Sequence, residues 1–233
     1  MAMAVLLKNL VARTPQLEDL DAISELMALC ESVEHGVADR TPKDLLSHWQ
    51  KPDFHLANDA WVIVTTREQM VGFACVDYGE YALVSTFVCV HPDYRNRGIG
   101  TLLLRMVEMR AREHVHLAVP GTHVVLRGLV DQTNQEAQRL FEREGYKPGR
   151  RFLRISFSLA EDTEALVAPD ARQQYQTDIS LESGHTFGDL PLYDRDGLCS
   201  VRVYKTYEKE LRPAPWRNIH VEAGSEKLTS LIP

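Results

Sequence analysis

The sequence predicts an α/β fold in which short strands alternate with amphipathic helices. Runs rich in β-branched and aromatic residues recur at 60–66, 70–78, 81–90 and 122–130, as expected for strands. Apolar residues at helical spacing follow the third run. Between that strand and that helix the chain passes through two glycines. The 233 residues, 44% of them hydrophobic, suffice for one buried domain with an appendage.

The N-terminal elements are predicted from cap signals. Residues 10–13 form a short strand, and Thr14 with Pro15 starts a helix. Its apolar face comprises Leu20, Ile23, Leu26, Met27 and Cys30. The pattern breaks over residues 31–40, which places Glu34 and His35 in an exposed loop that could also contact a substrate.

A second short helix is predicted to begin at Thr41 and Pro42. An antiparallel hairpin, 60–66 and 70–78, then leads into the strand 81–90.

The central helix runs from Gly98 to about His114, and the strand 122–130 follows it. A capping box from Thr133 to Glu136 opens another helix, which Gly145 ends. A strand at 151–159 completes the series.

The loop between the strand 81–90 and its helix has the features of an anion site. The first turn of a helix leaves backbone N–H groups unpaired and carries a positive dipole end, which favours a phosphate. Arg95 and Arg97 add positive charge, and Gly98 and Gly100 let a ligand approach the backbone. The spacing excludes the P-loop and the dinucleotide fingerprint. The structural alternative is a glycine-rich turn with arginines facing solvent.

These residues resemble the GNAT superfamily of N-acetyltransferases, whose signature is Arg/Gln-x-x-Gly-x-Gly/Ala after a strand that ends in Val-x-Pro. Arg95, Gly98 and Gly100 fill that signature. The resemblance implies a GNAT fold over about residues 8–160, with a central mixed, mostly antiparallel sheet flanked by helices and a C-terminal extension. It also implies acetyl-CoA as the acyl donor.

A second family motif runs from Asn134 through Ala137 and Phe141 to Gly145 and Tyr146. The resemblance implies that the strand end, the loop and this helix hold the cofactor. The implied cofactor-binding residues are Val88, Cys89, Val90, Arg95, Asn96, Arg97, Gly98, Ile99, Gly100, Thr101, Asn134 and Phe141. For Asn134 alone, a polar residue in a first helical turn is an equal alternative.

The catalytic residues are not identified by the sequence. Many family members carry a tyrosine at the position of Phe141, where its hydroxyl protonates the departing thiolate, and phenylalanine cannot do so. The strand 81–90 contains no carboxylate, which leaves Asp77 and Glu80 just before it as weak candidates for a base. The alternative is that both are solvated turn residues.

The C-terminal third is irregular. Residues 192–198 repeat the type of residues 140–146, and a β-like stretch follows both. We interpret 161–211 as a degenerate partial second unit or an edge-capping extension, and 212–233 as a tail. In that unit Tyr193 corresponds to Phe141 and is a further weak catalytic candidate. Coincidence between two helix–glycine–strand junctions is the alternative.

The composition argues against several classes of binding partner. A net charge of −7 argues against nucleic-acid binding. Four scattered cysteines indicate neither a disulfide framework nor a metal site. No apolar run is long enough to cross a membrane, so a cytoplasmic protein is expected, with a homodimer left open.

We therefore expect an N-acetyltransferase that uses acetyl-CoA and an amine acceptor from a small molecule or peptide. A non-catalytic module that binds acyl-CoA for regulation is the alternative. A structural subunit without a cofactor is a third reading.

Overall fold

The computed structural model describes residues 6–7, 9–36, 41–80, 82–159, 173–181 and 199–213. The strands are β1 (Leu6–Leu7), β2 (Leu10–Arg13), β3 (Ala60–Thr65), β4 (Met70–Glu80), β5 (Leu83–Val90), β6 (Val124–Asp131), β7 (Lys147–Leu159), β8 (Gln173–Leu181) and β9 (Cys199–Arg212). The α-helices are α1 (Leu20–His35), α2 (Pro42–Trp49), α3 (Leu56–Asp59), α4 (Ile99–His114) and α5 (Gln135–Arg143), and the 3₁₀ turns are η1 (Leu17–Asp19), η2 (Pro92–Tyr94) and η3 (Val115–Leu117). None of the helices in these ranges is long and apolar enough to span a membrane.

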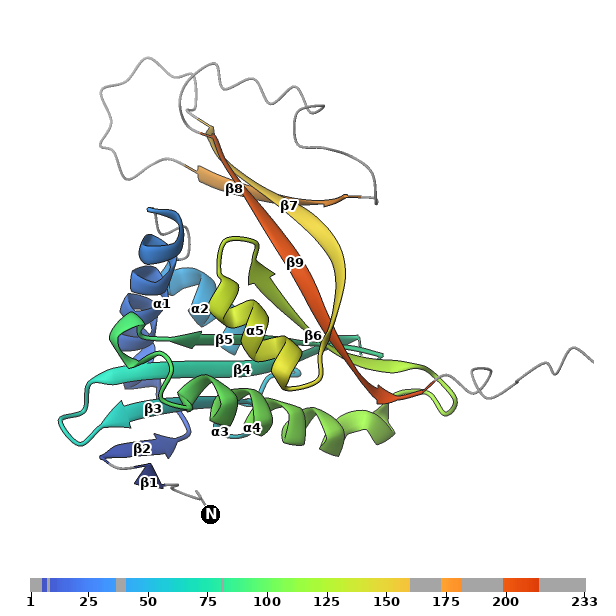
Figure 1. Ribbon diagram of the computed structural model, residues 1–233, viewed down its shortest axis with the longest axis horizontal. Helices are drawn as coiled ribbons and strands as arrows, with labels where there is room; N and C mark the ends of the chain where they lie inside the picture. The colour runs from blue at the N-terminus through green and yellow to red at the C-terminus, as the bar shows by residue number, and fades with distance from the viewer. Residues whose placement is uncertain are drawn as a thin grey trace, which may run out of the picture.

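All these strands join one sheet in the order β1-β2-β3-β4-β5-β6-β9-β7-β8 (Figure 1). Neighbouring strands are antiparallel except β5 and β6, which run parallel. Helices pack on both faces. The predicted mixed, mostly antiparallel sheet flanked by helices is therefore confirmed.

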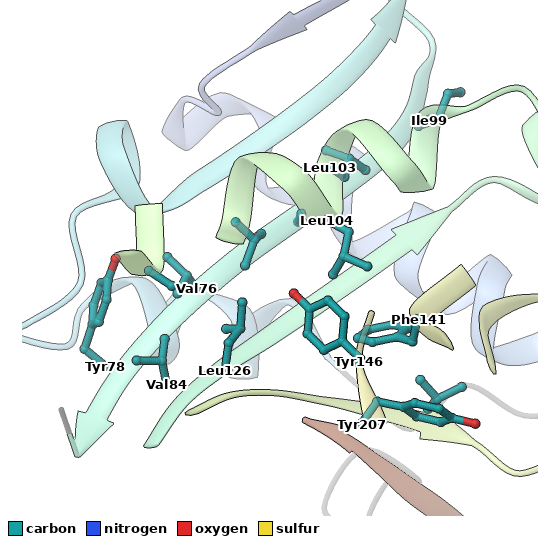
Figure 2. Packing of buried hydrophobic residues seen from close by; sticks show 14 of the residues in the cluster. Val76, Tyr78, Val84, Ile99, Leu103, Leu104, Leu126, Phe141, Tyr146 and Tyr207 are labelled. Atoms are coloured by element: carbon teal, nitrogen blue, oxygen red, sulfur yellow. The ribbon is translucent and has the colours of Figure 1, made fainter. Parts of the chain in front are cut away.

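Two apolar clusters cover the two faces of the sheet. One lies under α4 and α5 and contains Val76, Leu104 and Phe141 (Figure 2). The other lies under α1 and α2 and contains Phe73 and Trp49. Successive residues of β4 alternate between the two clusters, as expected for a strand that is buried on both faces.

The parallel pair β5 and β6 is short. Residues 83–86 of β5 pair with residues 125–128 of β6, and beyond Thr86 and Gly128 the two strands diverge (Figure 1). The other side of β5 stays paired with β4 as far as Val90. Residues 87–90 therefore have an edge without a strand partner among the described residues. We call it the open edge.

The start of α1 differs from the prediction. Thr14 and Pro15 do not begin the helix; η1 intervenes, and α1 starts at Leu20. The carboxylate of Asp19 accepts hydrogen bonds from the guanidinium of Arg13 at 2.6 and 2.7 Å and from Gln16 N at 2.7 Å, which fixes this entry. The helix also runs through Glu34 to His35, so Glu34 lies in the last helical turn rather than in a loop.

The cap of α5 also differs by one residue. Asn134, not Thr133, is the N-cap, because its Oδ1 accepts a hydrogen bond from Ala137 N at 2.9 Å. Thr133 instead donates to the carboxylate of Asp131. At the other end Gly145 has a φ of +85°, so the predicted end of this helix is confirmed.

The C-terminal strand lies in the interior of the sheet. The interpretation of residues 161–211 as an edge-capping extension is wrong for β9, because β9 pairs with β6 on one side and with β7 on the other. Tyr207, in β9, is fully buried in the cluster under α5. The sheet is therefore incomplete without β9. The repeated stretch at 192–198, including Tyr193, lies outside the described residues.

Candidate functional site

The loop after β5 ends at an open helix terminus. His91 N still donates to Val71 O of β4 at 3.0 Å, after which η2 turns the chain away. Asn96 and Gly98 have positive φ angles of 60° and 83°, and Gly98 is the N-cap of α4. No side chain of the described residues caps this terminus. The first-turn N–H groups of α4 therefore suit an external anion.

The two glycines of the loop serve different purposes. A Cβ on Gly98 would meet nothing within 4 Å, so glycine is required there by the backbone conformation. A Cβ on Gly100 would lie 2.8 Å from Cδ2 of Leu140. Gly100 therefore lets α5 pack close to α4, a reason for glycine that the sequence did not suggest. Ile99 is only 1% exposed, and its side chain belongs to the core.

The open edge presents the backbone of alternate residues. His91 N bonds to β4 and Ala82 O accepts from Val125 N of β6, so the even-numbered residues of β5 face the side of β6. The N–H and C=O groups of Val88 and Val90 thus lie along the open edge, and those of Cys89 face β4. Val90 O accepts from Arg95 Nε and Cys30 Sγ, each at 3.4 Å.

Cys89 has a packing role in addition to its backbone position. Its side chain is buried in the cluster under α1, where it hydrogen-bonds to Cys30. That hydrogen bond, together with the positive charge of Arg95, lowers the pKa of the Cys30 thiol despite its burial.

Arg95 is held by protein groups. Its Nη2 donates to Glu34 Oε1 at 2.9 Å, and its Nη1 lies 3.9 Å from Glu136 Oε2. Glu136 also accepts from Asn96 Nδ2 at 2.9 Å. Arg97 differs, because it is exposed and its guanidinium lies 4.8 Å from the centroid of the Tyr94 ring. Arg97 is thus the more accessible cation of the loop.

Asn134 lies where α5 approaches the end of α1. Its Oδ1 caps α5, and its Nδ2 donates to Glu34 Oε1 at 2.5 Å. The same carboxylate oxygen therefore receives hydrogen bonds from Arg95 and from Asn134. The structure thus brings together the two polar side chains that the sequence assigned to separate motifs.

Phe141 is a core residue. It is 5% exposed, and its ring lies 5.0 Å from that of Tyr146 and 5.6 Å from that of Tyr207, centroid to centroid (Figure 2). Its tip lies over Gly128, the last residue of β6 that pairs with β5. Phe141 therefore fills the place where the two strands separate.

Both tyrosines around Phe141 are held as neutral phenols. Tyr207 donates to Glu142 Oε1 at 3.0 Å on the outer side of α5, and burial, followed by this hydrogen bond, raises its pKa to about 12. Burial likewise raises the pKa of Tyr146 far above its usual value, which keeps its phenol protonated.

The predicted candidates for a base do not meet the loop. Asp77 pairs with Ser85 at the other end of β5, and its carboxylate bonds to Lys51 Nζ at 2.6 Å. Burial opposes ionisation of Asp77, but Lys51 and the nearby His48 leave its pKa below the usual value. Glu80 ends β4 still farther along, and its side chain lies outside the described part of the structure.

Two side-chain contacts beside the loop could not be predicted from the sequence. Arg143, at the end of α5, donates from Nη2 to Thr101 Oγ1 in the first turn of α4 at 3.0 Å, and its side chain is 65% exposed. Glu34 reaches Arg95 over 61 positions of sequence. No spacing rule links residues this far apart, so only the tertiary fold reveals them.

This arrangement suits one kind of ligand. An anionic group would bind at the N-terminus of α4 between Arg97 and Arg143. A chain with amide groups, extending from that anion, would lie along the open edge and hydrogen-bond to Val88 and Val90 in the manner of an added strand.

Comparisons with known proteins agree with this geometry. Residues 57–148 match the family model described as an acetyltransferase (GNAT) domain. An acetyltransferase of Sodalis glossinidius is 24% identical over 127 residues, which are 52% of this chain and 84% of that protein. Both matches support the resemblance of this chain to the GNAT superfamily of acetyltransferases.

Solved structures share the fold. A GCN5-related N-acetyltransferase from Sphaerobacter thermophilus superimposes with a TM-score of 0.74 at 18% identity, over 90% of this chain and 98% of that one. A phosphinothricin acetyltransferase from Sinorhizobium meliloti, solved with acetyl-CoA, gives a TM-score of 0.52 at 14% identity, over 87% and 88% of the two chains. At sequence identities this low, the comparisons show that the fold is shared and say nothing further about function.

Proposed function

We propose that this protein is an N-acetyltransferase that transfers the acetyl group of acetyl-CoA to an amine of a small molecule or peptide. The observation that carries the proposal is the continuity of the open edge of β5 with the uncapped N-terminus of α4. Coenzyme A has the matching chemistry, since a pyrophosphate joins an arm with two amides. The match of this region to the acetyltransferase family model supports acetyl-CoA as the donor.

Most of the cofactor residues proposed from the sequence fall into two groups, and the remaining three, Arg95, Asn96 and Asn134, are hydrogen-bonded to Glu34 or Glu136. Val88, Val90 and the N–H groups of residues 98–101 offer backbone hydrogen bonds, and Arg97 offers charge. The side chains of Cys89, Ile99 and Phe141 contribute packing that shapes the site. Arg143 joins the first group as a further cation near the phosphates.

The transfer needs little from ionisable side chains. The amine nitrogen attacks the thioester carbon, a C–N bond forms, and the C–S bond breaks as its electron pair leaves on sulfur. The nitrogen loses a proton and the thiolate gains one, which gives an amide and free coenzyme A. Because a thiol has a pKa of about 8.5, the thiolate leaves without a strong acid.

Positioning supplies the rest of the proposed rate enhancement. The N–H of Val88 or Val90 can donate to the thioester carbonyl, and this hydrogen bond strengthens as negative charge develops on oxygen. Because backbone groups alternate in direction along β5, the N–H of Cys89 faces β4 and cannot donate to the thioester carbonyl.

A non-catalytic acyl-CoA sensor is the second candidate. It is favoured by the apolar packing of Phe141 and by the ion pair that holds Asp77. The experiment that separates the two follows free thiol release from acetyl-CoA with a panel of amines, peptide N-termini and aminoglycosides. Thiol release that depends on one acceptor supports the enzyme, whereas tight binding with no release across the panel supports the sensor.

A further inference from the structure

One carboxylate oxygen joins three elements at the end of the open edge. Oε1 of Glu34, in the last turn of α1, accepts from Nη2 of Arg95 at 2.9 Å and from Nδ2 of Asn134 at 2.5 Å. Arg95 follows β5, and Asn134 caps α5. The side chains of Glu34 and Arg95 are only 20% and 23% exposed. Both hydrogen bonds are therefore partly shielded from water, which strengthens them.

The hydrogen bonds of Glu34 to Arg95 and Asn134 form a bridge at the place where acetyl-CoA would enter. Arg95 Nε donates to Val90 O at the end of the open edge, and Asn134 shares the Glu34 oxygen with Arg95. Under the proposed function, on which this inference rests, an arm that pairs with the open edge and reaches the phosphate loop would therefore meet Arg95 and Asn134. Because the side chains of Arg95 and Asn134 both donate to one oxygen of Glu34, these two side chains lie close together. An amide chain that passes between Arg95 and Asn134 must displace at least one of them from Glu34.

We propose that Glu34 is a positioning residue that closes the donor site of the free protein and is displaced when the pantetheine arm binds. The phosphates then attract Arg95, and a carbonyl of the arm accepts from Asn134. Since Glu34 belongs to α1, which covers the opposite face of the sheet from α4, donor binding changes the contacts of that helix.

Glu136 provides a matched comparison. It carries the same charge beside the same loop, with Oε2 at 3.9 Å from Arg95 and Oε1 at 2.9 Å from Asn96. Its side chain is 51% exposed and belongs to α5 itself, so it does not tie α1 to α5. A purely electrostatic effect of a carboxylate on the phosphates would appear at both glutamates. A steric bridge across the path of the arm would appear only at Glu34.

The test uses two fragments of the donor. S-acetylpantetheine carries the amides and no charge, and adenosine 3′,5′-bisphosphate carries charge without the arm. Their dissociation constants are measured by calorimetry on the full chain and on the variants Glu34→Ala, Glu34→Gln and Glu136→Ala. Thermal melts check that each variant remains folded.

We expect Glu34→Ala to bind S-acetylpantetheine about tenfold more tightly than the wild type, because a charge-assisted hydrogen bond no longer has to be broken. Glu136→Ala should leave that affinity unchanged. Both alanine variants should bind the bisphosphate more tightly, since each removes a negative charge. Glu34→Gln, which keeps an oxygen acceptor, should show a smaller gain for S-acetylpantetheine and replaces the alanine variant if that one fails to fold.

An unchanged or weaker affinity of Glu34→Ala for S-acetylpantetheine would overturn the proposal, as would an equal gain at Glu136→Ala. Failure of the proposed function has a different signature. In that case the wild type releases no thiol from acetyl-CoA with any acceptor, whatever the affinities of the variants for S-acetylpantetheine.

Discussion

A Cβ atom on Gly128 would lie 2.6 Å from Cζ of Phe141. Gly128 is the last residue of β6 that pairs with β5, so the Phe141 ring covers the backbone where the strands separate. The glycine is thus required by a neighbouring side chain and not by its own backbone conformation. The position that carries a proton donor in many family members is occupied here by a packing residue.

Gly128→Ala should destabilise the protein. The added methyl group has no room beneath the Phe141 ring, and overpacking of this kind costs about 1–3 kcal/mol of the free energy of unfolding. Chemical denaturation measures the loss. The double variant Gly128→Ala with Phe141→Leu should lose less than the sum of the two single variants, and strict additivity would contradict the contact.

Gly98→Glu should abolish acetyl-CoA binding in a protein that still folds, although the positive φ of this position should cost about 1–2 kcal/mol of the free energy of unfolding. The new carboxylate would extend into the open space at the N-terminus of α4 and repel the pyrophosphate. Calorimetry gives the affinity. Gly121→Glu is the matched control, because Gly121 also has a positive φ of 82° and lies in an exposed turn before β6. Equal affinities of the two variants would refute the phosphate site.

Arg143→Ala should weaken acetyl-CoA binding by a few fold and leave binding of S-acetylpantetheine unchanged. The guanidinium is exposed, so its attraction to a phosphate is worth about 1 kcal/mol or less and should decrease at high salt. Arg139→Ala, one turn earlier on α5, is the control. A loss for both ligands would show that Arg143 acts on the structure instead.

Asp77→Asn should change the pH dependence of stability. The folded pKa of Asp77 lies below its unfolded value, so the ionised carboxylate stabilises the fold above about pH 4, and this contribution disappears as the pH falls through the folded pKa. At pH 7 the melting temperature of the wild type should exceed that of the variant by an amount equivalent to under about 1 kcal/mol, and the difference should shrink as the pH falls below about 4.

Two comparisons complete the test of Asp77. Asp53→Asn, at an exposed position near Lys51, should show no such difference. Because Asp77 lies in β4 opposite Ser85, at the end of β5 away from the loop, Asp77→Asn should retain acetyl transfer. Loss of turnover at unchanged stability would restore Asp77 as a candidate base.

A chain that ends at residue 160 should not form a folded domain. β9 supplies the partner of both β6 and β7, and Tyr207 fills the core under α5. In the full chain Tyr207→Ala should cost roughly 3–5 kcal/mol, and Tyr207→Phe far less. Circular dichroism and denaturation test this. A native-like fold of the shortened chain would support the boundary at 160 that the sequence suggested.

The sequence by itself determined the local features of the site. The run of β-branched residues before Pro92, the glycine that only a positive φ explains, and the helical spacing after it are short-range patterns that sterics and hydrogen bonding impose on neighbouring residues. These patterns predicted the strand, the loop and α4 to within a few residues. The resemblance carried by Arg95, Gly98 and Gly100 then named the family.

Only the tertiary structure decided which groups meet across that site. The contacts of Glu34 with Arg95 and Asn134, of Arg143 with Thr101, and of Phe141 with Gly128 each join segments that are distant along the chain. The tertiary structure also decided that β9 lies between β6 and β7, because any strand with an apolar face can pair with several sheet edges. Which arrangement forms depends on the total apolar surface that the whole chain buries. No local sequence pattern determines this total.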